Sequence, residues 1–279
     1  MKNILLPTDF SENSWNAILY AINFYENETC TFYLLHVEGF GSMVTDTPYI
    51  PESIAFEGDF INPAKIKLKQ ILKRISHTFS SNKKHKFYLL AEYNYLVDAV
   101  KKYVKEKKID LIVMGTKGAS GIKEKIIGSN TGNVITKISC TTLVVPKKAK
   151  FKIPKEIVFP TDFIQNFTFH LLQPIINIIK KKGSSLRIVH ITKQNTLLST
   201  EQQQNKHLLK DAFQNYNCSF HNLSTKKVEE AVLFFAEDRG IDLIVMVAKN
   251  VNYFQHLFFQ SRAEKISFHT NLPFLILHE

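Results

Sequence analysis

Short apolar runs rich in Val, Ile and Leu recur along the chain, and segments with helical spacing of apolar residues separate them. This alternation predicts two successive sets of five strands with helices between them. In the first set, strands are expected near 3–6, 31–36, 86–91, 110–114 and 142–145, and helices near 13–25, 64–78, 96–106 and 130–137. In the second set, strands are expected near 156–159, 185–190, 219–223, 242–246 and 274–277.

The strands are apolar on both faces, as in parallel sheets that are covered by helices on each side. The pattern therefore predicts an α/β fold made of two tandem five-stranded parallel-sheet, Rossmann-like domains. We expect the domains to span 1–147 and 154–279, with the Lys- and Pro-containing segment 146–154 as the linker.

Similar segments recur at regular offsets and indicate two copies of one domain. The segment 4–10 (ILLPTDF) recurs as 157–163 (IVFPTDF), an offset of 153 residues. The segment 109–114 (IDLIVM) recurs as 241–246 with the same six letters, an offset of 132. The first copy therefore carries about 20 additional residues between these segments, which we place in a long irregular insert, 39–63. The insert follows a strand, so it is either a lid over a ligand or a plain loop.

Composition narrows the class of protein. The sequence has no apolar run long enough to span a bilayer, and its first residues lead directly into a predicted strand, so we expect a cytoplasmic protein without a membrane partner. The three cysteines, Cys30, Cys140 and Cys218, form neither a disulfide framework nor a metal motif, and we expect them to be reduced.

The formal net charge is +11, and much of the excess lies on predicted helix faces and in the linker. In 64–79, for example, apolar residues form one helical stripe and the lysines fall largely outside it. We therefore interpret the charge as solvated helix surface. Nucleic-acid binding is the less favoured alternative, because no known nucleic-acid-binding motif or aromatic-basic ladder accompanies the charge.

A glycine-rich segment follows the buried strand that ends near Met114. Glycine lets a backbone approach an anion closely, and a helix N-terminus adds backbone N–H groups with partial positive charge. The spacing Gly115, Gly118, Gly128, Ser129 therefore predicts a phosphate-binding loop, to which Asn130 could add a backbone N–H. Lys117 and Lys123 could offset phosphate charge, although exposed lysines are more often simply solvated.

Other candidate residues follow neighbouring strands. Ligands of open α/β sheets bind beyond the carboxyl ends of the strands, where the strand order reverses. Asp9, Val37 and Met114 are expected at such ends and could converge on one ligand. Asp9 could instead be a turn or helix-capping carboxylate, and His36 is expected to be a packing residue rather than a catalyst.

These motifs together resemble the universal stress protein family, whose nucleotide-binding members carry Gly-x2-Gly-x9-Gly-Ser/Thr. The triplet Pro7-Thr8-Asp9 and the pair His36-Val37 also match that family. The resemblance covers nearly the whole chain and implies a tandem member of the family that binds ATP with Mg²⁺ in its first domain. It implies that Pro7, Thr8, Asp9 and Val37 lie around the adenine and ribose. It further implies that the phosphates lie near Met114, Gly115, Gly118, Gly128, Ser129 and Asn130.

The second copy lacks the glycine pattern. At the offset of 132, the positions of Gly115, Gly118 and Gly128 correspond to Val247, Asn250 and Gln260. The serine is kept, since Ser261 corresponds to Ser129. Because β-branched Val247 resists positive φ, we expect no ATP in this copy. Aromatic residues occupy its loop region, at Tyr253, Phe254, Phe258 and Phe259. The resemblance suggests that the second copy replaces the second subunit of a family dimer through the last strands, 142–145 and 274–277. A homodimer of the tandem chain remains an alternative.

No catalytic constellation accompanies the glycine loop. The sequence has no Walker motif, no Gly-x-Ser-x-Gly elbow and no His-Glu-x-x-His motif, and no general base or metal ligands are evident. We therefore expect a nucleotide-binding regulatory protein that acts in stress responses through a protein partner, and not an enzyme. The alternatives are a slow ATPase and a non-nucleotide scaffold or binder of a small apolar ligand.

Overall fold

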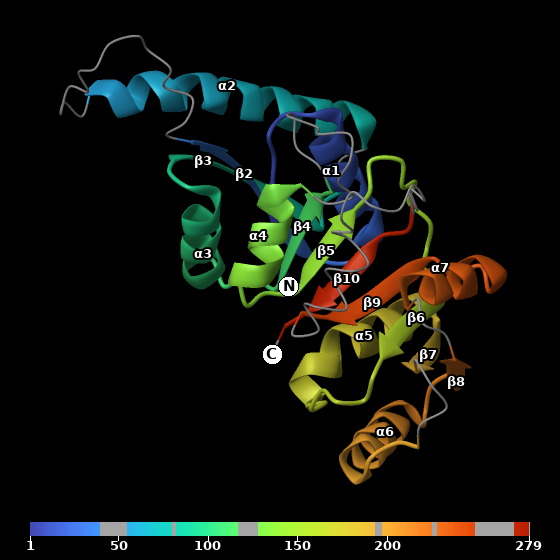
Figure 1. The fold of residues 1–279 in the computed structure, drawn as a ribbon. Helices are drawn as coiled ribbons and strands as arrows, with labels where there is room; N and C mark the ends of the chain where they lie inside the picture. The colour runs from blue at the N-terminus through green and yellow to red at the C-terminus, as the bar shows by residue number, and fades with distance from the viewer. Residues whose placement is uncertain are drawn as a thin grey trace. The chain divides into compact units, whose positions relative to one another are not determined.

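In the computed structural model of this chain, the described residues are 1–39, 55–79, 82–116, 128–192, 197–224, 228–248 and 271–278. For 55–61 and 228–229 the description covers the backbone alone. Strands and helices alternate along the chain as the hydrophobic pattern predicts (Figure 1). Residue contacts divide the chain into two compact units, Met1–Ile122 with Gly128–Cys140 and Lys123–Ile127 with Thr141–Glu279.

The first unit contains four strands in the order β3-β2-β1-β4. Their bounds are Lys2–Pro7 for β1, Cys30–Glu38 for β2, His85–Tyr93 for β3 and Leu111–Gly115 for β4. The β1–β2, β2–β3 and β1–β4 pairs are all parallel. Because β1 lies between β2 and β4, the strand order reverses at β1, and the carboxyl ends of these three strands lie at one edge of the sheet.

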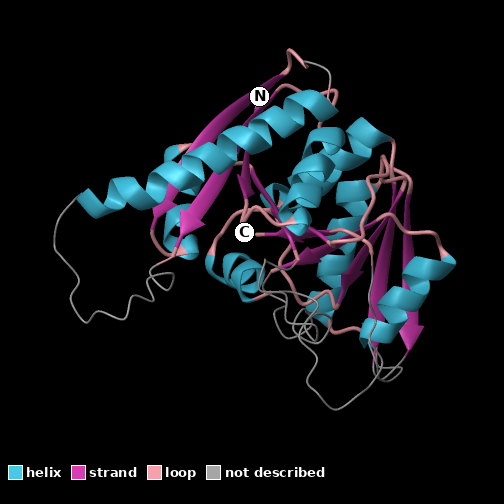
Figure 2. Ribbon diagram, turned by 90° about the horizontal axis from the view of Figure 1, so that it is seen from above, coloured by secondary structure: helices cyan, strands magenta, loops and turns pink. Residues whose placement is uncertain are grey.

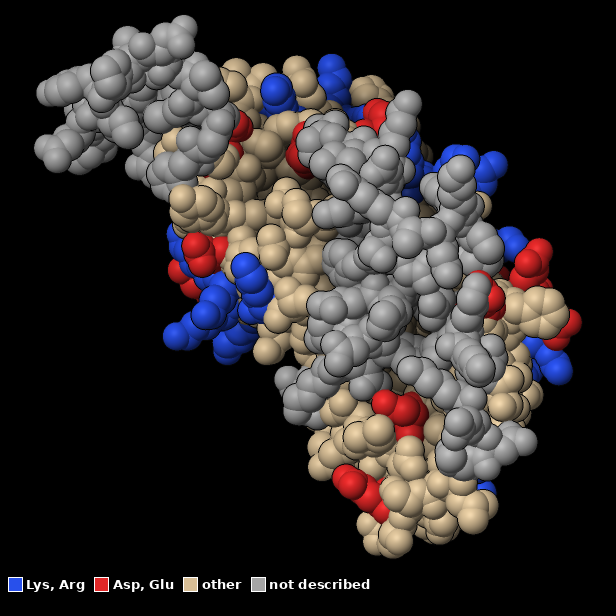
Figure 3. Space-filling view, in the orientation of Figure 1, with Lys and Arg blue, Asp and Glu red and all other residues tan. Residues whose placement is uncertain are grey.

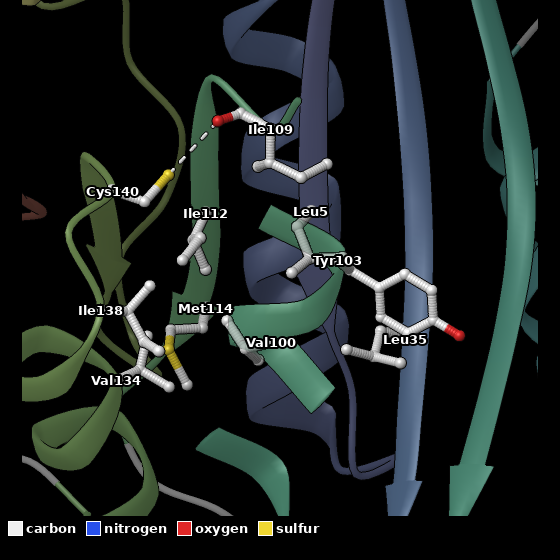
Figure 4. Close-up of a cluster of buried hydrophobic side chains, with 10 residues drawn as sticks. All are labelled: Leu5, Leu35, Val100, Tyr103, Ile109, Ile112, Met114, Val134, Ile138 and Cys140. Atoms are coloured by element: carbon white, nitrogen blue, oxygen red, sulfur yellow. Dashed lines mark hydrogen bonds between the residues drawn. The ribbon is translucent and has the colours of Figure 1, made fainter. Parts of the chain in front are cut away.

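Helices cover both faces of this sheet (Figure 2). Their bounds are Glu12–Phe24 for α1, Ala55–Thr78 for α2, Leu96–Glu106 for α3 and Ser129–Lys137 for α4. Side chains alternate along β1, so Ile4 and Leu6 face α1, while Leu5 faces α3 and α4. Leu5 joins a buried cluster with Leu35 and Ile112 and with residues of α3 and α4 (Figure 4).

The start of α2 differs from the prediction. The segment 39–63 was expected to be irregular, but α2 begins at Ala55 and continues through Pro63. Proline at 63 removes one helical hydrogen bond and crowds the carbonyl four residues earlier, which is the reason for expecting no helix here, yet α2 continues through this exposed position. The predicted stripe is confirmed at Ala64, Leu68 and Ile75, which are all at least 95% buried. Of the possible lid at 39–63, residues 40–54 lie outside the described residues.

The second unit contains the remaining strands in the order β5-β10-β9-β6-β7-β8. Their bounds are Thr142–Val145 for β5, Glu156–Thr161 for β6, Ser185–Thr192 for β7, Cys218–Ser224 for β8, Leu243–Val247 for β9 and Phe274–Leu277 for β10. Its helices are α5 (Phe169–Lys182), α6 (Thr200–Phe213) and α7 (Val228–Asp238). The β6–β7, β7–β8, β6–β9 and β9–β10 pairs are parallel.

One pair in the second unit is antiparallel. In it, β5 lies beside β10 with Leu143 opposite Leu275, so the last strand of the first repeat pairs with the last strand of the second. Contacts thus group β5 with the second unit, whereas the sequence places it as the fifth strand of the first domain. The domain bounds 1–147 and 154–279 stay a prediction.

Basic and acidic side chains are both present on the surface, and the cysteines are at least partly buried. On the face shown in Figure 3, Lys and Arg side chains form separate groups with acidic side chains between them, including one group along α2 at the top. Cys30 and Cys140 are buried and Cys218 is half-buried, and none of these three cysteines is joined in a disulfide. None of the helices in the described ranges combines the length and the apolar character that a membrane span requires.

Candidate functional site

The chain leaves β1 through a turn that its own side chains hold together. The Phe10 amide donates to Thr8 Oγ1 at 3.1 Å, and the Ser11 amide and hydroxyl donate to Asp9 Oδ1 at 3.1 and 2.6 Å. Ser11 then caps α1 by accepting from the Ser14 amide at 3.2 Å. Asp9 is therefore a turn carboxylate in this structure, held in a fixed position at the end of β1.

His36 connects this turn to β2. Its Nδ1 lies 2.8 Å from the Thr8 carbonyl oxygen and its Nε2 lies 3.1 Å from Glu38 Oε2. The imidazole also packs on Phe10, with ring centroids 4.3 Å apart. Phe10 adopts a φ of 65°, a left-handed conformation that side chains with a Cβ rarely take. The predicted packing role of His36 is confirmed, and it holds the end of β2, where Val37 lies, against the turn.

The two ends of the glycine-rich loop meet at the carboxyl end of β4. The Gly128 amide donates to the Thr116 carbonyl, and the Thr131 hydroxyl donates to the Gly115 carbonyl at 2.8 Å in a buried position. These bonds bring the start of α4 next to the end of β4. Lys117, Gly118 and Lys123 lie outside the described residues.

Gly115 is also in tight contact with α1. A Cβ on residue 115 would lie 2.7 Å from Asn13 Nδ2 and 2.8 Å from Asn13 Cγ, and Asn13 is only 4% exposed. Glycine at 115 thus permits α1 to pack against the end of β4. Sequence reasoning missed Asn13, because a polar residue in the first turn of a helix gives no sign of its tertiary contact.

The N-terminus of α4 is suited to an anion. Its N-cap residue is Gly128, which has no side chain that could bond the first-turn amides, and Ser129 and Asn130 are exposed. The aligned peptide dipoles place partial positive charge at this end of a helix. A phosphate group could therefore accept hydrogen bonds here from backbone amides and from the Ser129 hydroxyl.

The remaining predicted residues lie at the same edge of the sheet. Pro7, Val37 and Met114 lie at or near the carboxyl ends of three neighbouring strands, and strand order places β1 between the other two. Thr8 and Met114 are buried, with 6% and 5% exposure, whereas Asp9 and Val37 are half-buried. The arrangement therefore offers a polar turn on β1, an apolar wall near Val37 and an uncapped helix start after β4.

The second repeat keeps the turn but not the glycine. Phe163 has a φ of 60°, its ring stacks on His190 at 4.8 Å, and His190 Nδ1 lies 3.0 Å from the Thr161 carbonyl oxygen. The Ile164 amide likewise donates to Asp162 Oδ1 at 3.0 Å. This turn is therefore a structural feature of the repeat and does not by itself mark a nucleotide site.

Val247 is the last residue of β9, as Gly115 is of β4, and it is 3% exposed. Asn166, three residues after Phe163 as Asn13 is after Phe10, is exposed. The close approach of asparagine to glycine thus belongs to the first repeat. Asn250, Gln260, Ser261 and the aromatic residues of 253–259 lie outside the described residues.

Two further observations concern titratable groups. Over the described ranges, His, Cys, Asp and Glu side chains form no group of three or more that could hold a metal ion. His278 follows β10 at the carboxyl edge of the second unit, where burial lowers its pKa to about 4.

The chain is similar to known proteins in sequence and in fold. Residues 1–146 match the model of the universal stress protein family. A universal stress protein of Methanocaldococcus jannaschii is 29% identical over 154 residues, which are 53% of this chain and 84% of that protein. A second universal stress protein of the same organism is 29% identical over 160 residues, 53% of this chain and 96% of the relative.

A solved universal stress protein from Archaeoglobus fulgidus has the same fold over nearly the full length. It superposes with a TM-score of 0.68 at 18% identity, over 99% of this chain and 96% of the other. The family model matches more than half of the chain, over the repeat that carries the glycine pattern and the Pro-Thr-Asp turn. The chain is a member of the universal stress protein family.

Proposed function

We propose that the first repeat binds ATP with Mg²⁺ and that nucleotide occupancy regulates the binding of a protein partner. The observation that carries the proposal is the pair of hydrogen bonds from Gly128 and Thr131 to the end of β4. They hold an uncapped helix start at the edge of the sheet where the strand order reverses, beside the Asp9 turn.

In this proposal, the α4 N-terminus with Ser129 and Asn130 takes the phosphates, together with Gly115 and Gly118. Asp9 and the backbone near Val37 take the ribose and adenine, and Pro7, Thr8 and Met114 form the base of the site. Mg²⁺ would bridge phosphate oxygens and neutralise part of their charge, as it does in other ATP sites.

We further propose that the second repeat binds no ATP and acts as the internal partner of the first. Two findings support this role: Val247 in place of Gly115, and the antiparallel pairing of β5 with β10. Three cysteines without a disulfide fit a reducing compartment, such as the cytoplasm.

The test compares equivalent serines of the two repeats. Calorimetric titration with Mg-ATP is performed on the wild type, on Ser129→Val and on Ser261→Val, which lies 132 residues later. We expect binding to weaken at least tenfold in Ser129→Val, because the hydroxyl donor at the helix start is lost, and to be unchanged in Ser261→Val. A Gly118→Val variant should abolish binding.

The same preparations separate the alternatives. If the wild type releases phosphate from ATP and Ser129→Val does not, the protein is a slow ATPase rather than a regulatory binder. If ATP binds to none of the proteins and leaves their thermal unfolding unchanged, nucleotide binding is wrong and the scaffold alternative stands.

A further inference from the structure

A cavity lies at the end of the first unit opposite to the proposed nucleotide site, at the amino ends of the strands. It has a volume of about 520 Å³ and lies among the last turns of α1 and α2 and the start of β3. The β2 strand has nine residues, so its two ends are about 26 Å apart at about 3.3 Å per residue. The cavity is therefore separate from the proposed nucleotide site.

The inner wall of this cavity is apolar. Ile22 and Ile75 are 3% and 4% exposed, whereas Leu72, Phe79 and Phe87 remain half-buried around the opening. Phe87 is held by its stacking on Phe32, with ring centroids 5.1 Å apart. The volume of the cavity falls in the range of about 300–1,000 Å³ that is common for small-molecule sites.

Hydrogen bonds hold the rim in place without any ligand. Asn82 Nδ2 donates to the Glu26 carbonyl at 2.8 Å, and Asn82 Oδ1 accepts from the Lys84 amide at 3.0 Å. His85 Nε2 lies 3.0 Å from the Tyr25 carbonyl oxygen, which ties the start of β3 to the end of α1. The opening is thus pre-organised, which lowers the entropy lost when a ligand binds.

The rim also has an excess of positive charge. Lys83 and Lys84 line it and are exposed, and Glu26 is the one acidic residue among the lining side chains. Lys84 Nζ is directed to the Asn27 carbonyl at 3.3 Å, so its ammonium lies at the mouth. An anionic head group at the rim would be attracted by both ammonium groups.

We infer that this cavity binds a small amphipathic carboxylate whose hydrocarbon body contacts the apolar wall and whose carboxylate faces Lys83 and Lys84. Apolar burial supplies most of the binding free energy for such a ligand, and the two lysines select a carboxylate over a neutral head group.

The probe is decanoate, used below its micellar concentration and titrated calorimetrically into the full chain, with decanol as the neutral counterpart. We expect saturable binding of decanoate and at least tenfold weaker binding of decanol. Ser76→Trp places an indole from the exposed rim of α2 into the cavity and should abolish binding. His77→Trp, at an exposed neighbouring position outside the lining, should bind like the wild type.

The charge is tested by Lys83→Glu with Lys84→Glu, which should weaken decanoate binding at least tenfold while leaving decanol unchanged. The control is Lys101→Glu with Lys105→Glu, an equal charge change on the exposed face of α3. Thermal unfolding confirms that each variant folds. The inference is overturned if decanoate shows no saturable binding to the wild type. It is also overturned if the wild type and Ser76→Trp bind decanoate equally well, or if the wild type binds decanoate and decanol with equal affinity.

Discussion

The side chain of Asn13 lies where a side chain on residue 115 would have to go, with only 2.7 Å from its Nδ2 to the position of a Cβ. Asn13 belongs to α1, and Gly115 is the last residue of β4. Glycine at this position therefore has a packing role that is independent of any ligand. Because Asn13 is buried, it has little room to rotate away.

This contact predicts the effect of Gly115→Ala on stability. The added Cβ forces either α1 or the end of β4 to move, and such overpacking costs about 1–3 kcal/mol of the free energy of unfolding. Urea denaturation measures the loss. Gly39→Ala is the matched control, since a Cβ there meets no atom within 4 Å, and it should change stability little.

A double-mutant cycle with Asn13→Ala assigns the cause. Asn13→Ala removes the crowding side chain, so Gly115→Ala should cost much less in that background than in the wild type. Equal costs in both backgrounds would show that the Asn13 contact is not the source of the strain.

We expect alanine replacements of His36 and His190, the equivalent histidines of the two repeats, to differ in their effect on ATP binding. His36 and His190 make the same contact with a turn carbonyl, and replacing either with alanine should lower the free energy of unfolding by about 1–3 kcal/mol. Only His36→Ala should also weaken ATP binding, by about tenfold or about 1.4 kcal/mol, because it loosens the Asp9 turn. Calorimetric titration of both variants distinguishes the repeats. Weaker ATP binding in His190→Ala would contradict the assignment of the site to the first repeat.

The burial of His278 leads us to expect a loss of stability in mild acid. Burial lowers the pKa of His278 in the folded protein to about 4, below the ordinary value of 6.5. Between these two values the unfolded chain binds a proton that the folded chain does not, so the free energy of unfolding falls as the pH falls. Above pH 6.5 this contribution is fully present.

Urea denaturation at a series of pH values between 7 and 4 checks this dependence. His278→Gln should flatten the pH dependence in that window. His170→Gln, at an exposed position on α5, should leave it as in the wild type. A His278→Gln curve that parallels the wild type would rule out His278 as the group responsible.

The periodicity of the chain was sufficient to predict most of the secondary structure. The bounds of β5, β10 and α3 agree with the expectation, and the other predicted elements differ by at most two residues at either end, except for the start of α2. Strand and helix periods arise from local geometry, so a single sequence carries them. The start of α2 was missed because Pro63 lies inside it, and proline is disfavoured in the interior of a helix.

The sequence by itself also determined the internal repeat, the family resemblance and the residues at the carboxyl ends of β1, β2 and β4, since these depend on residue type and spacing. Tertiary structure alone decided which side chains those residues meet. Asn13 against Gly115 and His36 against Thr8 join residues that are 102 and 28 positions apart in the sequence. Such contacts depend on how elements pack in three dimensions, and local spacing holds no record of them.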